Sequence, residues 1–209
     1  MVAAASAPSR GHTVLTLDLA LTLRHDGRGG VADDLTVPAD LTAWVRQRST
    51  VFATGLDAVR YTADPANLQE VRSLRSAVRA LFARAVRPAP PSRADAHRLP
   101  TVPQALAVLN AAARRVPVVP VLAWPEGAAP ALDATPAARA VAGDLLITSL
   151  AGAAGAFLTG PDAERLRVCP GPRCVRYFLK EHPRQGWCTP SCGNRARVAR
   201  HHERQRATP

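Results

Sequence analysis

Four cysteines near the C-terminal end constrain this chain more than any other feature of its sequence. They form the pattern C-x4-C-x13-C-x3-C, at Cys169, Cys174, Cys188 and Cys192. Each close pair can supply two thiolates from one short loop, and the spacer returns the chain to complete a tetrahedron around one zinc ion. Four protein ligands leave no open position for water, so the pattern predicts a structural zinc ion rather than a catalytic one. An iron–sulfur cluster, a disulfide and unrelated cysteines are the weaker interpretations.

The segment that carries these cysteines, residues 165–209, is too short to bury a large apolar core. A bound metal should therefore supply much of its folding free energy, and we expect the segment to be largely disordered without metal. His182, His201 and His202 also lie in this segment. We expect all three at the surface, because four thiolates already complete the site.

The positive charge of the chain is concentrated in the same segment. Residues 1–164 hold 16 Arg and 14 Asp or Glu, a net charge of +2, whereas residues 165–209 hold 11 Lys or Arg and 2 Glu, a net charge of +9. The two values add to the +11 of the whole chain. A localised cationic segment predicts a polyanionic partner, although an arginine-rich end can also simply be solvated.

A helix should follow the third cysteine, because Thr189 and Pro190 form a typical N-cap and first-turn pair. Cys192 then lies in the first turn. Arg195 falls on the side nearer the cysteines and is expected to pair within the segment. The opposite side gathers four residues that we predict to bind nucleic acid: Arg197, Arg200, His201 and Arg204. Arginine donates two hydrogen bonds to one phosphate, so DNA is the predicted partner.

The residues before this segment show mainly helical periodicity. Their apolar positions predict four helices, over 38–49, 65–86, 103–115 and 136–160. Asp64 is expected to cap the second of these helices. The last helix is apolar on nearly all sides, so we expect it either at the centre of a core or in a homodimer interface.

Other parts of this region favour strands and loops. A first strand is expected over 12–23, where apolar and polar residues partly alternate, and an irregular hairpin is expected over 116–133. Residues 87–100 are rich in proline and polar residues and are expected to form an exposed loop. The arginines of the helix over 65–86 are expected to lie off its apolar face: Arg72, Arg75 and Arg79.

These patterns predict an α+β protein. A predominantly α-helical N-terminal domain with a small antiparallel β element, residues 1–164, would be followed by a zinc finger, residues 165–209. The first residues lack the basic and apolar stretches of a secretory signal. The longest apolar run, residues 145–158, is too short and too rich in Ala and Gly to span a bilayer comfortably. We therefore expect a cytoplasmic protein with no membrane partner, whose reduced cysteines bind metal.

The end of the chain, WC…CGNRARVARHHERQR, resembles the CGNR zinc finger of bacterial proteins. Upstream, the stretches LTLDLALTL, LRSAVRALF and ALAVLNAAARRVPVVPVL are similar to the ABATE domain that usually precedes this finger. The resemblance implies a stress-induced transcriptional regulator with a DNA-binding finger of treble-clef-like fold. It also implies zinc ligation by the four cysteines, with Gly193, Asn194 and Arg195 completing the named motif.

This chain departs from the relatives in two places. Relatives often read Asp-Phe-x-Asn-Thr near the start, and here Leu21 stands where Asn is usual. Asp18 and Thr22 remain, and we take them as a candidate ligand site of the N-terminal domain. Many relatives carry Asp-x-Ser-Arg after the finger's Phe, where this chain reads FLKEHPRQGWC.

These features support three functional hypotheses of different kinds. The first is a transcriptional regulator that binds DNA through the finger and senses a small molecule or a protein through the N-terminal domain. The second is a zinc-stabilised protein-interaction adaptor that does not bind nucleic acid. An enzyme is the third and least supported, because Asp18, Asp33, Asp34 and His25 are close in sequence but form no recognised catalytic motif. We therefore do not expect an enzyme.

Overall fold

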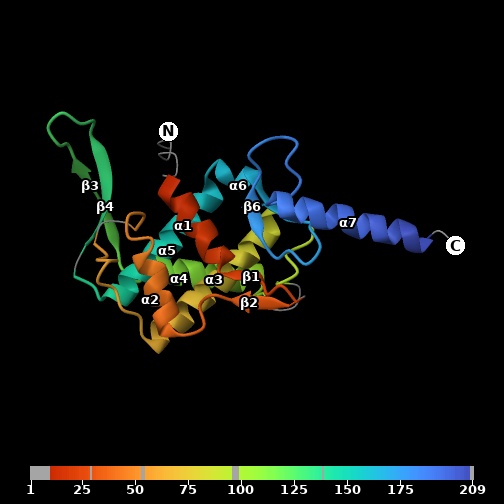
Figure 1. The fold of residues 1–209 in the computed structure, drawn as a ribbon. Coiled ribbons are helices and arrows are strands. Elements are labelled where there is room, and N and C mark those ends of the chain that lie inside the picture. The colour runs from red at the N-terminus through yellow and green to blue at the C-terminus, as the bar shows by residue number, and fades with distance from the viewer. Residues whose placement is uncertain (1–9, 29, 53–54, 96–98, 138, 208–209) are drawn as a thin grey trace.

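The computed structural model describes residues 10–28, 30–52, 55–95, 99–137 and 139–207. Residues 1–9, on which the expectation of no secretory signal partly rests, lie outside this part of the chain. The helices are α1 (Arg10–Leu21), α2 (Pro38–Arg46), α3 (Pro65–Ala85), α4 (Val102–Arg114), α5 (Ala142–Thr159), α6 (Asp162–Arg165) and α7 (Pro190–Ala207). The strands are β1 (Leu23–His25), β2 (Val31–Asp33), β3 (Val118–Ala123), β4 (Ala131–Pro136), β5 (Leu166–Val168) and β6 (Tyr177–Leu179). Within the described residues the strands form three antiparallel pairs, β1–β2, β3–β4 and β5–β6, so the fold is α+β and mainly helical, as predicted (Figure 1).

Helices α1, α3, α4 and α5 pack together and form the core. By length and composition α5 could cross a membrane. Most of its large apolar side chains are instead buried against the other helices, among them Leu146, Leu150 and Phe157. The apolar helix therefore lies at the centre of the core, which is the first of the two positions that its sequence allows.

The longest helix, α3, begins as the sequence predicts. The side chain of Asp64 accepts a hydrogen bond from the backbone N–H of Asn67 at 2.7 Å, and Pro65 occupies the first turn. The prediction for its arginines is wrong at Arg75 and Arg79, because both side chains are buried. Burying a guanidinium requires a carboxylate partner, and the fold supplies one to each of these two arginines.

Residues 10–21 form helix α1, so the predicted strand over 12–23 is wrong. The leucines at every second position imitate a strand. The residues that pack into the core, however, are Leu15, Thr16, Leu19 and Ala20, whose spacing fits one face of a helix. This face packs against α5 and α3, and tertiary packing overrides a weak local pattern. Extended structure begins only at β1.

Two further predictions need correction, and α2 also ends at Arg46 rather than at residue 49. Helix α5 begins at Ala142 rather than near 136, because residues 131–136 pair with β3 and extend the predicted hairpin. The segment 87–100 is not exposed throughout, since Ser92 and Asp95 are buried. Both side chains bind the guanidinium of Arg79.

The β5–β6 hairpin packs on the helical core. Leu166 and Tyr177 are buried with the core residues of the N-terminal helices. The ring of Phe82 on α3 contacts both Phe157 and Tyr177, at centroid distances of 5.3 and 5.4 Å. Burying one such side chain stabilises a fold by roughly 1.5–3 kcal/mol. The two parts of the chain therefore share one apolar core. The predicted domain boundary between residues 164 and 165 stays a prediction.

Candidate metal centre and basic face

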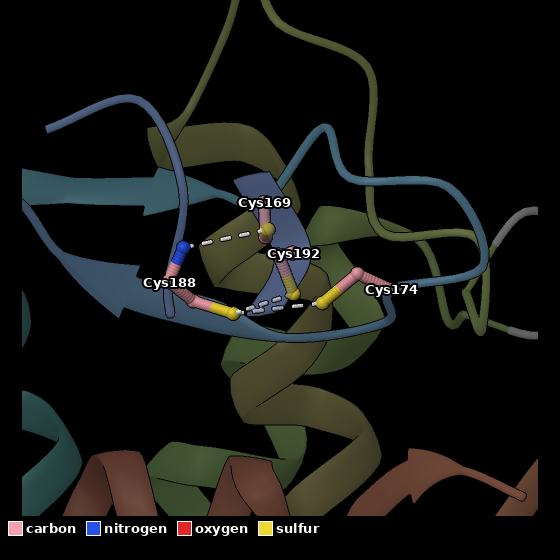
Figure 2. A group of neighbouring side chains, drawn as sticks. All are labelled: Cys169, Cys174, Cys188 and Cys192. Carbon is pink, nitrogen blue, oxygen red and sulfur yellow. Dashed lines mark hydrogen bonds between the residues drawn. The ribbon is translucent and has the colours of Figure 1, made fainter. Parts of the chain in front are cut away.

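Two elements bring the four cysteines together. Cys169 follows β5 directly, and Cys174 lies in the turn that leads to β6. Cys188 precedes α7, and Cys192 lies in the first turn of that helix. In Figure 2 the sulfur atoms of the turn and of the helix start point toward one another. The hairpin turn contributes two ligand atoms, and the start of α7 with the loop before it contributes the other two.

The sulfur positions fit one tetrahedral metal ion. All four Sγ atoms lie within 4.8 Å of one another. The Sγ of Cys188 lies 3.7 Å from that of Cys174 and 3.5 Å from that of Cys192. A zinc ion about 2.3 Å from each of four sulfurs requires sulfur–sulfur edges of about 3.8 Å. A disulfide requires about 2.05 Å, and all four cysteines are free.

Hydrogen bonding among the packed thiols shifts their pKa values in opposite directions. Hydrogen bonds from Cys174 and Cys188 lower the pKa of Cys169 to about 2. The same contacts, with burial, raise the pKa of Cys174 to about 11 and the pKa of Cys188 far above its usual range. Without a cation these three cysteines therefore favour a single thiolate, at Cys169. A divalent metal ion supplies the positive charge that four thiolates need.

Two glycines make the close approach of these elements sterically feasible. A Cβ atom added to Gly171 would lie 3.0 Å from the Cβ of Cys192 and 3.5 Å from the Sγ of Cys169. A Cβ atom added to Gly193 would lie 2.8 Å from the ring of Trp187. Gly193 directly follows Cys192. Because glycine has no Cβ, the indole of Trp187 can pack against the start of α7 at this position.

Hydrogen-bond donors surround the sulfur atoms. The backbone N–H of Cys188 donates to the Sγ of Cys169 at 3.4 Å. The guanidinium of Arg195 donates to the Sγ of Cys192 at 3.0 Å. This contact confirms the expectation that Arg195 pairs within the segment. Such donors offset the negative charge of metal-bound thiolates and fix their orientation.

Helix α7 projects from the metal centre away from the helical body (Figure 1). The four residues predicted to bind nucleic acid are exposed on it: Arg197, Arg200, His201 and Arg204. Arg197 donates a hydrogen bond to the side chain of Asn194. Arg200 and Arg204 donate from Nε to backbone carbonyls one turn earlier in the same helix. The guanidinium groups of these three arginines therefore lie along the surface of α7, hydrogen-bonded to groups of the same helix.

A cavity of about 540 Å³ lies between the start of α7 and the loop before it. Arg197 and Arg200 line it on the helix, and His182, Arg184 and Trp187 line it on the loop. Among the described residues, none of those lining this cavity is acidic. Sequence reasoning missed the loop residues, although HPRQGW combines basic and aromatic side chains in one short stretch. His201 and Arg204 lie further along α7.

Comparison with known families matches both parts of the chain. The model of the ABATE family, described as "Putative stress-induced transcription regulator", matches residues 13–161. The chain belongs to the ABATE family. The model of the CGNR zinc finger matches residues 165–205. No curated protein matches the sequence.

A buried polar network joins the ABATE domain to the CGNR finger. The guanidinium of Arg79 binds both carboxylate oxygens of Asp95 at 2.7 and 3.0 Å, and it is fully buried. It also donates to the carbonyl oxygen of Val175 at 3.2 Å. Ser92 Oγ donates to the same carbonyl at 2.8 Å, and Tyr177 Oη donates to Asp95 at 2.9 Å. The residue that follows Cys174 is thus bound to helix α3.

The candidate ligand residues of the ABATE domain have partners within the chain. Asp18 forms an ion pair with Arg48 at 2.8 Å. Thr22 is buried, donates to the carbonyl of Leu19 at 2.8 Å, and accepts a hydrogen bond from Arg75 at 2.8 Å. The structure therefore places both residues in contacts that hold the fold.

The other acidic residues considered for catalysis are also paired. Arg75 binds both carboxylate oxygens of Asp33 at 2.6 Å, and Arg24 binds Asp34 at 2.5 Å. Burial alone would raise the pKa of Asp33, but the hydrogen bonds from Arg75 and from the backbone of Leu35 bring the net pKa below its usual value. The contacts with Arg75 therefore favour the charged form of Asp33.

Proposed function

We propose that this protein is a transcriptional regulator that binds DNA through helix α7 and the loop before it. One observation carries the proposal: the cavity beside the metal centre gathers Arg184, Arg197, Arg200 and the indole of Trp187. Guanidinium groups bind phosphate oxygens with two hydrogen bonds, and aromatic rings beside them suit nucleic acids. The net charge of +9 on residues 165–209, from 11 Lys or Arg and 2 Glu, supports a polyanionic partner.

We propose zinc as the metal. The four-sulfur ligand set, the sulfur–sulfur distances and the match to a zinc-finger family support this choice. The ion would supply cross-linking and positive charge. Its four ligands would fix the hairpin against the start of α7, and so set the direction in which the arginines project. The treble-clef-like arrangement of the finger is part of the same proposal.

The ABATE domain would act as the sensor of a small molecule or a protein. The family's description as a stress-induced regulator supports this assignment. The polar network at Arg79 supplies a physical connection between such a domain and the finger. We further propose that the protein works in the cytoplasm and has no catalytic activity. The acidic residues considered for catalysis are paired with arginines.

A salt titration of DNA binding tests the proposal. Full-length, metal-loaded protein would be titrated into a fluorescent mixed-sequence duplex at several salt concentrations. The logarithm of the association constant should fall linearly with the logarithm of salt concentration, by about 0.9 for each phosphate contacted. Arg197→Ala with Arg200→Ala should weaken binding and reduce that slope by about 2.

Two exposed arginines outside the finger provide the matched control. Arg60→Ala with Arg84→Ala removes the same charge from the ABATE domain and should leave the slope unchanged. Metal content and the circular dichroism spectrum would verify that both double variants fold. A protein that binds no duplex even at low salt would contradict the proposal and favour the adaptor hypothesis. Equal slopes for the two double variants would contradict the role of α7.

A further inference from the structure

The β3–β4 hairpin exposes an unusual amount of apolar surface. Val118, Val119, Val121, Leu122 and Leu132 are 45–71% exposed, and Trp124 at the end of β3 is 70% exposed. Single exposed apolar residues are ordinary on protein surfaces, but a contiguous group of this kind marks an interaction site. Figure 1 shows the hairpin extending from the helical body at the end opposite α7.

The described side chains on one face of this hairpin are uncharged. The register pairs Val118 with Pro136 and Leu122 with Leu132. Side chains at alternate positions of a strand share a face, so Val118, Pro120 and Leu122 of β3 share one face with Leu132 and Pro136 of β4. None of these five residues is charged. Such a face offers nothing to a charged partner and suits another apolar face.

The outer edge of β4 can accept another strand. The N–H of Ala137 donates to the carbonyl of Pro117 at 2.9 Å. In an antiparallel pair the backbone N–H and C=O groups point alternately toward the partner strand and away from it, so this bond determines which residues of β4 point away from β3. By that alternation the N–H groups of Leu132 and Ala134 point away from β3. On β3 the outward position between 118 and 122 is Pro120, which has no N–H. The outer edge of β4 therefore offers two successive outward N–H groups to another strand, whereas on the outer edge of β3 the series of outward N–H groups is broken at Pro120.

We propose that this hairpin is the homodimerisation surface, with a second copy of the chain as its occupant. Antiparallel pairing of β4 with β4 of the second copy is self-complementary, as a twofold axis requires. It would form a four-stranded sheet with one continuous charge-free face, whereas an isolated two-stranded hairpin is only marginally stable. A stable interface buries about 800 Å² per partner over 20–30 residues. The hairpin with its two flanking residues, 117–137, has 21 residues and so is long enough to form one.

The dimer is independent of nucleic-acid binding. The hairpin lies at the opposite end of the molecule from α7, so a hairpin dimer leaves both basic helices uncovered (Figure 1). It also replaces α5 as the expected dimer contact, since most large apolar side chains of that helix are buried in the core. Failure of the DNA titration would leave this proposal intact, and the reverse also holds.

Sedimentation equilibrium of the full-length, metal-loaded protein tests the proposal. We expect a dimer at concentrations of about 1–100 μM. Leu132→Lys should weaken association by about 10-fold, because a lysine from each copy would then lie in the paired β4 strands, where like charges destabilise the pairing. Leu106→Lys with Val59→Lys, which alters two exposed apolar residues elsewhere, should leave association unchanged.

A second variant keeps the test decisive if the lysine variant does not fold. Ala134→Pro removes one outward N–H without adding charge or breaking the bonds between β3 and β4, and it should also weaken the dimer. A native protein that remains a monomer throughout this range would overturn the proposal. So would a dimer that both hairpin variants leave unaffected.

Discussion

The guanidinium of Arg79 donates a hydrogen bond to the carbonyl oxygen of Val175, at 3.2 Å, and this contact joins the core helix α3 to the metal-binding turn. Arg79 is fully buried, and Val175 directly follows Cys174. Ser92 Oγ donates to the same carbonyl at 2.8 Å. The position of the finger on the ABATE domain is therefore fixed by buried polar groups as well as by apolar packing.

Replacing Arg79 should strongly destabilise the protein. Arg79→Met leaves the carboxylate of Asp95 buried without its counter-charge, and breaking a buried pair in this way costs about 3–5 kcal/mol of unfolding free energy. Arg84→Met, at an exposed position of the same helix, should change the unfolding free energy by less than about 0.5 kcal/mol. Urea unfolding of the two variants measures the difference. Equal midpoints would show that the buried pair contributes nothing.

Removing the metal should loosen the ABATE domain as well as the finger. The finger contributes Leu166 and Tyr177 to the common core, so disorder in the finger exposes the face of α3 that they cover. Hydrogen exchange of peptides from α3 should become several-fold faster after chelation, and α2, which lies farther from the finger, should change less. If only finger peptides exchange faster, the two parts are energetically independent.

A methyl group at Gly171 should weaken metal binding. Its Cβ would lie 3.0 Å from the Cβ of Cys192, so the turn and the helix start would have to separate. Overpacking of this kind costs about 1–3 kcal/mol, which corresponds to roughly 5- to 150-fold in affinity. Competition with a chromogenic chelator measures the effect of Gly171→Ala. Gly186→Ala, where a Cβ meets no atom within 4 Å, should retain native affinity; equal affinities for the two variants would refute the steric role.

The two tyrosines should resist ionisation in the folded protein. Burial, with the nearby charges of Asp64 and Glu70, raises the pKa of Tyr61 to about 12. Burial and the charge of Asp95 raise the pKa of Tyr177 further. Folding raises both pKa values, so the folded state is favoured while the tyrosines are protonated. This contribution to the free energy of unfolding is fully present below the unfolded pKa of about 10, and it is lost as the pH rises toward the folded pKa values.

An absorbance titration of tyrosinate checks this prediction. Native protein should show little tyrosinate at pH 10, and protein in denaturant should be about half ionised there. The free energy of unfolding should begin to fall above about pH 10. A native protein with half of its tyrosine ionised at pH 10 would mean that the rings of Tyr61 and Tyr177 are accessible to water.

The sequence predicts the local features of this protein well. The pairs of cysteines are close in sequence, so their spacing alone indicates a tetrahedral site. Asp64 and Pro65 define the start of α3 because a cap depends only on neighbouring residues. The fold class follows from the helical periodicity of the chain. The expectation for Arg195 also holds, because its partner Cys192 lies one helical turn away.

Features that depend on distant contacts escape such reasoning. Nothing in residues 87–100 distinguishes Asp95 from a solvated loop carboxylate until the fold places it beside Arg79. The leucines of α1 alternate like a strand, and only packing against α5 and α3 selects the helical face. His182 and Arg184 lie around the same cavity as Arg197 and Arg200 because the loop before α7 folds back on that helix. No local pattern in the sequence specifies this arrangement.

The most direct test of this account compares DNA binding by the full-length protein with zinc, with chelator, and with zinc restored, at one low salt concentration. The metal centre should set the position of α7 and its arginines, so binding should be strong with zinc, lost on chelation and recovered when zinc is returned. Unchanged affinity in protein shown to be free of metal would contradict the claim that the four-sulfur centre organises the nucleic-acid-binding surface.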